Sequence, residues 1–170
     1  MKNFFTRRSG NFLGFSACAG MMAFALYSQH VLGLDPCPLC IFQRVAVVGL
    51  GVLFLIAAIH SPGRLGCWIY AVLLVAVSLA GSAVSARHVW LQNLPPDQVP
   101  SCGPGLDFML DTFAFTEVLN MVLSGSGECA EVSWSVFGLS MPAWTFIALL
   151  GLGLYGVAAN LLAGSRPQVS

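Results

Sequence analysis

Four long apolar runs dominate the pattern of hydrophobic and polar positions along the chain, near residues 11–31, 41–60, 67–86 and 142–163. Each run is long enough to cross a bilayer as a helix, which needs about 20 residues at about 1.5 Å of rise per residue. Alternating strand patterns are not visible, and irregular backbone exposed to lipid would leave its amides unpaired. We therefore predict an all-α membrane protein, a single domain over residues 1–170 built as an antiparallel four-transmembrane-helix bundle.

The composition supports a membrane location. Of the 170 residues, 57% are hydrophobic and 8% are charged, whereas roughly a quarter of the residues of a soluble globular protein are charged. This composition excludes a soluble globular protein. We expect the lipid bilayer to surround the chain, and we expect no nucleic acid among its partners.

The charges are distributed unevenly, which predicts the orientation of the helices. Residues 88–141 contain no Lys or Arg but hold six of the seven acidic residues, whereas cations flank the other helix ends at Lys2, Arg7, Arg8, Arg64 and Arg166. By the positive-inside rule, both termini are cytoplasmic and the loops near 32–40 and 87–141 face outward. Arg87, at the edge of the longer loop, is the one cation that argues against this orientation.

The basic N-terminus followed by an apolar run also resembles a signal peptide, and "FSAC", which ends at Cys18, loosely resembles a lipoprotein cleavage site. Cleavage is the weaker interpretation. The apolar stretch before Cys18 is short, and no A-x-A-like site follows the run.

The six cysteines divide according to this topology. Cys18 and Cys67 fall in apolar runs and are expected to be small buried hydrophobic residues. The other four, Cys37, Cys40, Cys102 and Cys129, lie in outward segments, where two disulfides are possible. A Cys102–Cys129 bond could be a structural staple, for which chain entropy predicts roughly 3 to 4 kcal/mol. From the residues alone, the staple is the favoured interpretation of this pair, and a redox role remains open.

The sequence "CPLC" at residues 37–40 is harder to explain as a staple, because a bond across two residues closes almost no chain. We expect the second membrane helix to begin near Cys40, where the helix dipole stabilises a thiolate. Arg44 follows at i+4 on the same helical face, so its charge could stabilise that thiolate or an anion forming on a bound acceptor. The alternative for Arg44 is a side chain that reaches toward the lipid headgroups.

Other interpretations of this motif fit less well. A four-cysteine zinc site would need the second pair closely spaced, but 26 residues separate Cys102 from Cys129. Haem attachment needs a histidine after the second cysteine, where this chain has Ile41. A thioredoxin-type enzyme would need a soluble βαβ frame. We therefore expect no metal at the site.

Several motifs together resemble one known family. "PCPLCIFQR" before a membrane helix, "RHVWLQ" after the third run, two cysteines in the outward loop, and "GECAEVSWSVFGLSMPAW" leading into the fourth run are similar to the disulfide bond formation protein B family, DsbB. The resemblance covers essentially the whole chain. It implies a bacterial inner-membrane protein, multi-pass, with its active cysteines on the periplasmic side.

The resemblance also implies an electron relay. A reduced DsbA-type thiol oxidase would attack the Cys102–Cys129 disulfide, with Cys102 forming the mixed disulfide. The loop thiols would then reduce Cys37–Cys40, through a transient Cys37–Cys129 bond. Cys40 would pass the electrons to a membrane quinone, ubiquinone or alternatively menaquinone, held near Arg44 and His88. The family assignment thus favours a redox role for the loop pair over a staple.

Some features leave alternatives open. Residues 107–123 could form a short helix lying on the membrane or belong to a partly disordered loop. We expect the bundle to pack through Ser78, Ser82 and the glycines at 151, 153 and 156. Two other functional classes also remain: a four-span adaptor with purely structural disulfides, and a membrane protein that handles metal ions.

Overall fold

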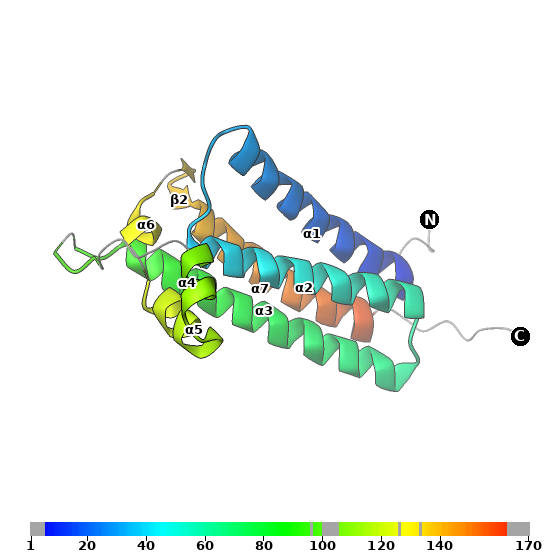
Figure 1. Cartoon of the computed structure of the whole chain (residues 1–170). Coiled ribbons are helices and arrows are strands. Elements are labelled where there is room, and N and C mark those ends of the chain that lie inside the picture. Colours follow the sequence, from blue (N-terminus) through cyan, green and yellow to red (C-terminus); the bar gives the residue numbers. More distant parts are fainter. Residues whose placement is uncertain (1–5, 96, 100–105, 126, 133, 163–170) are drawn as a thin grey trace, which may run out of the picture.

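The computed structural model describes residues 6–95, 97–99, 106–125, 127–132 and 134–162. Its four long helices are α1 (Arg7–His30), α2 (Pro38–His60), α3 (Arg64–Gln92) and α7 (Met141–Val157), the last continued by a π-helical turn at Ala158–Leu162 (Figure 1). Each is long and apolar enough to cross a membrane. The predicted four-helix membrane bundle is therefore confirmed, while the side on which each terminus lies stays a prediction.

The helix ends follow local capping signals. Thr6 caps α1 by accepting a hydrogen bond from the backbone N–H of Ser9, whose side chain in turn accepts from the backbone N–H of Thr6. Ser61 ends α2 in a left-handed conformation, with φ of 43°. Helix α3 continues past residue 86, where the apolar run ends, to Gln92. The first residues of the expected outer loop 87–141 therefore belong to α3. His88 lies on this last part of the helix.

Small residues bring α3 and α7 together. Ser78 and Ser82 are buried, and the Ser78 hydroxyl donates to a backbone carbonyl of α7 at 2.7 Å. Gly153 and Gly156 are buried too, and a Cβ on Gly153 would collide with the Ser78 side chain. Packing through these residues agrees with the sequence-based expectation. The expectation was wrong for Gly151, which is exposed because it lies on the opposite face of α7.

The end of the bundle where α1 begins is closed by polar contacts to the last helix. Asn11 donates to the Asn160 side chain at 3.1 Å, and Asn160 donates back to Asn11 at 3.0 Å; both residues are buried. Tyr155 donates its hydroxyl to the carbonyl of Gly10 at 2.8 Å. Satisfied amide pairs of this kind hold helices together in an apolar environment. Helix α1 is therefore clamped to the last helix at this end.

The segment between α3 and α7, called the outward segment after its predicted side, contains several short elements: α4 (Leu106–Thr112), α5 (Phe115–Ser124), α6 (Gly127–Ala130), β1 (Ser135–Val136) and β2 (Leu139–Ser140). Residues 107–123, for which the sequence left a short helix and a partly disordered loop open, contain parts of two helices, because Ala114 adopts an extended conformation and separates α4 from α5. The short antiparallel ladder β1–β2 was not expected. It is closed by Phe137 and Gly138, with φ of 52° and 77°.

The apolar side of α5 faces the bundle. Val118 and Val122 are buried in one cluster with Leu39 of α2, and Cys37 and Cys129 belong to the same cluster. Burial of these side chains stabilises the outward segment against the start of α2. The sulfur of Cys129 is thereby placed beside the Cys-x-x-Cys motif.

Arg87, the cation that argued against the predicted orientation, has a structural role. Its Nε donates to the carbonyl of Leu123 at 3.0 Å, and its Nη2 donates to the carbonyl of Ser124 at 3.2 Å. These are the last carbonyls of α5, where a positive charge also interacts favourably with the helix dipole. Its guanidinium lies 4.1 Å from the ring centroid of Trp90. Arg87 thus fastens α5 to α3.

Candidate functional site at the start of α2

Cys37 and Cys40 lie at the first turn of α2. Cys37 is the N-cap residue, and its sulfur accepts a hydrogen bond from the backbone N–H of Cys40 at 3.4 Å. The thiol of Cys37 donates to the Cys40 sulfur at 3.1 Å. The helix begins at Pro38, slightly before the expected start near Cys40, because proline suits the first helical position. Both sulfurs therefore lie at the positive end of the helix dipole.

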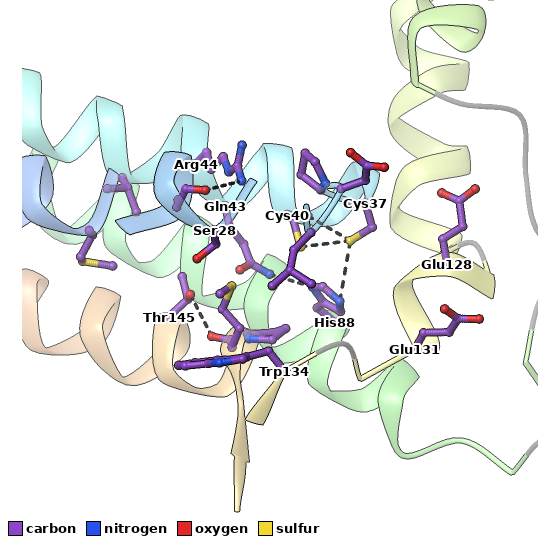
Figure 2. Close-up of a pocket in the computed structure, with 18 of the residues that line it drawn as sticks. Ser28, Cys37, Cys40, Gln43, Arg44, His88, Glu128, Glu131, Trp134 and Thr145 are labelled. Carbon is purple, nitrogen blue, oxygen red and sulfur yellow. Dashed lines mark hydrogen bonds between the residues drawn. The ribbon is translucent and has the colours of Figure 1, made fainter. Parts of the chain in front are cut away.

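A cavity of about 130 Å³ lies beside the two cysteines. Residues of α1, α2, α3 and the start of α7 line it, and Figure 2 shows Trp134 on the side opposite Cys40 and Gln43. Methionines supply much of its apolar wall, at positions 21, 22 and 141. Its polar lining includes Ser28, Gln43, Arg44, His88 and Thr145, and three acidic residues, Asp35, Glu128 and Glu131, also line it. The cavity thus joins a mostly apolar space to a few directed polar groups, as in most small-molecule sites.

Arg44 lies one turn after Cys40, as its spacing predicted, and lines the same cavity. Its Nη1 donates to the side-chain oxygen of Gln29, and its Nη2 donates to the carbonyl of Ala25 at 3.1 Å. Arg44 is half-buried, and these contacts hold its guanidinium against α1. It therefore lies within the protein, beside the cavity, and does not depend on lipid headgroups for its hydrogen bonds.

His88 approaches the cysteines from α3. It also contacts Gln43, a residue that the sequence analysis did not include in the site. Its Nε2 lies 3.8 Å from the Cys37 sulfur, and its Nδ1 lies 3.1 Å from the side-chain nitrogen of Gln43. Both side chains are buried, at 2% exposure for His88 and 5% for Gln43. A signal for Gln43 was present, since an uncharged polar residue inside a membrane helix is itself a candidate functional group.

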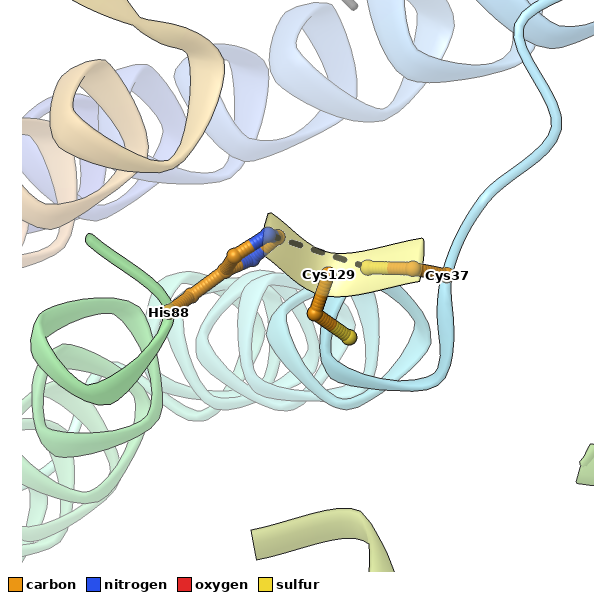
Figure 3. A group of neighbouring side chains, drawn as sticks. All are labelled: Cys37, His88 and Cys129. Carbon is orange, nitrogen blue, oxygen red and sulfur yellow. Dashed lines mark hydrogen bonds between the residues drawn. The ribbon is translucent and has the colours of Figure 1, made fainter. Parts of the chain in front are cut away.

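The sulfur of Cys129 joins this group from the outward segment. The Cys37 sulfur, a ring nitrogen of His88 and the Cys129 sulfur all lie within 4.8 Å of one another, and Figure 3 shows the three side chains together. Cys129 comes from α6, which packs against α3. Five of the expected site residues, Cys37, Cys40, Arg44, His88 and Cys129, therefore converge at one end of the bundle. The sixth, Cys102, lies outside the described residues.

Comparison with known proteins agrees with this arrangement. The family model for the disulfide bond formation protein DsbB matches residues 7–159, which include all of the residues just described. The chain belongs to the DsbB family. It is 57% identical over 143 residues to disulfide bond formation protein B of Nitrosococcus oceani, covering 84% of this chain and 85% of the relative. It is 52% identical over 151 residues to that of Hahella chejuensis, covering 89% and 92%.

Membership of the DsbB family, together with the four apolar helices, makes this chain a multi-pass membrane protein of disulfide bond formation. Such a protein exchanges disulfides with a partner, which requires sulfurs that can approach one another. The Cys37, Cys40 and Cys129 sulfurs meet that requirement.

The same sulfurs and His88 could in principle hold a metal ion, because Zn²⁺ prefers thiolate and imidazole ligands. Ligand atoms around Zn²⁺ lie about 3.5 to 3.8 Å apart, which follows from its bond lengths and tetrahedral angle. The spacing of up to 4.8 Å in this DsbB-family chain is wider. The absence of a metal at the site therefore stays a prediction, and Zn²⁺ would require the widest-spaced ligand atoms to move closer together.

Proposed function

We propose that this chain is a quinone-dependent thiol oxidoreductase that generates disulfides for a periplasmic DsbA-type dithiol oxidase. The observation that carries the proposal is the convergence of three sulfurs beside a largely apolar cavity with a cation in its wall. Thiol–disulfide exchange needs an open approach between sulfurs, whereas a quinone has to stay in lipid. A dithiol at a membrane-helix end, within reach of a loop cysteine, serves both requirements.

In the proposed route, the partner reduces the Cys102–Cys129 pair and Cys129 then exchanges with Cys37. Cys40 finally delivers the electrons to the quinone. The overall last step is balanced when the Cys37 thiol and the Cys40 thiolate form their disulfide, giving up two electrons and one proton. Reduction of the quinone to quinol consumes both electrons and two protons, so the second proton comes from solvent.

The cavity suits a quinone ring in size and chemistry. Its volume of about 130 Å³ is comparable to the roughly 150 Å³ of an engineered protein cavity that binds benzene. Methionine side chains adapt to a flat ring, and Arg44, Ser28 and Thr145 are polar groups that could contact its carbonyl oxygens. Ubiquinone and menaquinone share this ring chemistry, and ubiquinone is our first choice.

The proposed electron route also implies a membrane and an orientation for the chain. A bacterial inner membrane supplies the quinone pool, and Cys37 and Cys40 lie on the periplasmic side. The excess of cations outside residues 88–141 supports this orientation.

Trapping of the exchange intermediate tests the proposal. In a Cys40→Ala variant, Cys37 has lost its neighbouring sulfur, so mild oxidation should link Cys37 to Cys129. Peptide mapping under non-reducing conditions detects the linked peptides. A Cys18→Ala, Cys40→Ala double variant is the matched control and should give the same link, because Cys18 is buried in the other core cluster. A Cys129 that never pairs with Cys37 would contradict the proposed relay.

The purified protein can also be used to distinguish the proposed enzyme from the two other functional classes. An adaptor with structural disulfides would keep its outer bonds in the presence of a reduced thioredoxin-like protein. A metal-handling protein would retain a stoichiometric amount of zinc or copper on its reduced cysteines, which metal analysis of the purified protein would detect.

A further inference from the structure

We infer that His88, positioned by Gln43, acts on the sulfur of Cys37 and stabilises its thiolate, rather than acting on the quinone. The catalytic role that this inference gives to His88 rests on the proposed function. The contacts that carry it do not depend on the quinone. Gln43 lies six residues after Cys37 in the sequence and contacts His88, which approaches the Cys37 sulfur from α3 at the edge of the cavity (Figure 2).

The direction of the hydrogen bonds assigns the role. The side-chain nitrogen of Gln43 can only donate, so it holds Nδ1 of His88 as an acceptor at 3.1 Å. The remaining ring proton of the neutral imidazole is then on Nε2, which faces the Cys37 sulfur at 3.8 Å. The backbone N–H of Cys40 approaches the same sulfur at 3.4 Å. Two N–H donors therefore converge on Cys37.

Burial makes these donors effective. His88 is 2% exposed, Gln43 is 5% exposed and Cys37 is 9% exposed, so water competes little for their hydrogen bonds. In a poorly solvated site, a thiolate depends on the donors that the protein supplies. In this arrangement neutral His88 is a hydrogen-bond donor to the Cys37 sulfur and is not the base that takes its proton.

A thiolate on Cys37 is needed at a defined point of the proposed cycle. The Cys37–Cys40 bond forms only after Cys37 has lost its proton, and Cys37 also has to leave Cys129 as a thiolate when their mixed disulfide is exchanged. A more stable thiolate is a faster leaving group. His88 thus contributes to both steps from one position, and Gln43 fixes the ring that does so.

Two readouts test the inference in the purified protein. The first is the alkylation rate of Cys37 by iodoacetamide at neutral pH, measured by mass spectrometry in a reduced, quinone-free Cys40→Ala background. We expect His88→Phe to lower this rate about tenfold or more, because it removes one hydrogen bond to a charged sulfur, and Gln43→Met to lower it less, because it removes only the contact that orients His88. Ser85→Ala is the matched control, because Ser85 is buried on the same helix as His88 but donates its hydroxyl to the carbonyl of Gly81 and does not line the cavity. It should leave the rate unchanged.

The second readout is steady-state quinone reduction with Cys40 present. We expect the His88 and Gln43 variants to lower kcat and to leave the KM for quinone unchanged, because they act on Cys37. A raised KM with an unchanged kcat, or an unchanged Cys37 alkylation rate in both variants, would overturn the inference. Failure of the proposed function has a different signature: the wild-type protein would then reduce no quinone, while the alkylation differences would persist.

Discussion

Replacing either Cys37 or Cys40 by serine is expected to abolish quinone reduction by a reduced DsbA-type partner. The two sulfurs lie 3.1 Å apart and act as one two-electron unit, so a single thiol has no partner with which to form the disulfide at α2. Groups that act as a unit are strongly non-additive, and we expect a loss of roughly 10³-fold or more from each variant. The Cys37→Ser, Cys40→Ser double variant should be no less active than either single variant.

The measurement is quinol formation under anaerobic conditions with a saturating reduced partner. Cys18→Ala and Cys67→Ala serve as controls, because both residues are buried cysteines located away from the cavity. They should retain activity and show that the loss is specific to the pair. Full turnover in Cys37→Ser or Cys40→Ser would remove the proposed route.

Arg44→Met is expected to raise the KM for quinone while changing kcat less. The guanidinium lines the cavity one turn beyond Cys40, where it can donate to a carbonyl oxygen of the quinone. A hydrogen bond from a charged group contributes about 1.5 to 3 kcal/mol, so its loss should raise KM roughly ten- to a hundredfold. Methionine retains much of the apolar stem and removes only the charge and the donors.

Arg44 also anchors α1, and this second role needs its own control. Gln29→Ala removes the side-chain acceptor for Nη1 on α1 but leaves the charge in place. We expect Gln29→Ala to change the KM for quinone much less than Arg44→Met does. Equal effects would show that Arg44 acts by holding α1, and an unaltered quinone dependence in Arg44→Met would leave it without a role in quinone binding. Titrations of initial rate against quinone concentration distinguish these results.

The fold could be predicted largely from the sequence because its main determinant is local. A membrane helix requires a long apolar run, and four such runs are visible directly. The short elements of the outward segment were harder to predict from the sequence. Helix α5, for example, is held by burial of Val118 and Val122 against another part of the chain. The break at Ala114 has no glycine or proline to announce it.

The candidate site was predictable to the extent that its residues are neighbours in the sequence. The Cys-x-x-Cys spacing and the i+4 position of Arg44 follow from helix geometry. The contacts of His88 do not, because its partners Cys37 and Gln43 are 51 and 45 residues away. Helices that are apolar on all sides give no sequence signal for the face that turns inward. The polarity of Gln43 within an apolar run marks it as a candidate, but only tertiary packing shows that its partner is His88.

The central claim is that electrons pass from a partner dithiol through this chain to a membrane quinone. The most direct measurement follows both ends of that route at once, with the purified protein in lipid nanodiscs, a reduced thioredoxin-like partner and ubiquinone, in the absence of oxygen. We predict one quinol for each partner disulfide formed, because each exchange transfers two electrons. Partner oxidation without quinol formation, or equal quinol formation by a protein lacking both Cys37 and Cys40, would contradict the account.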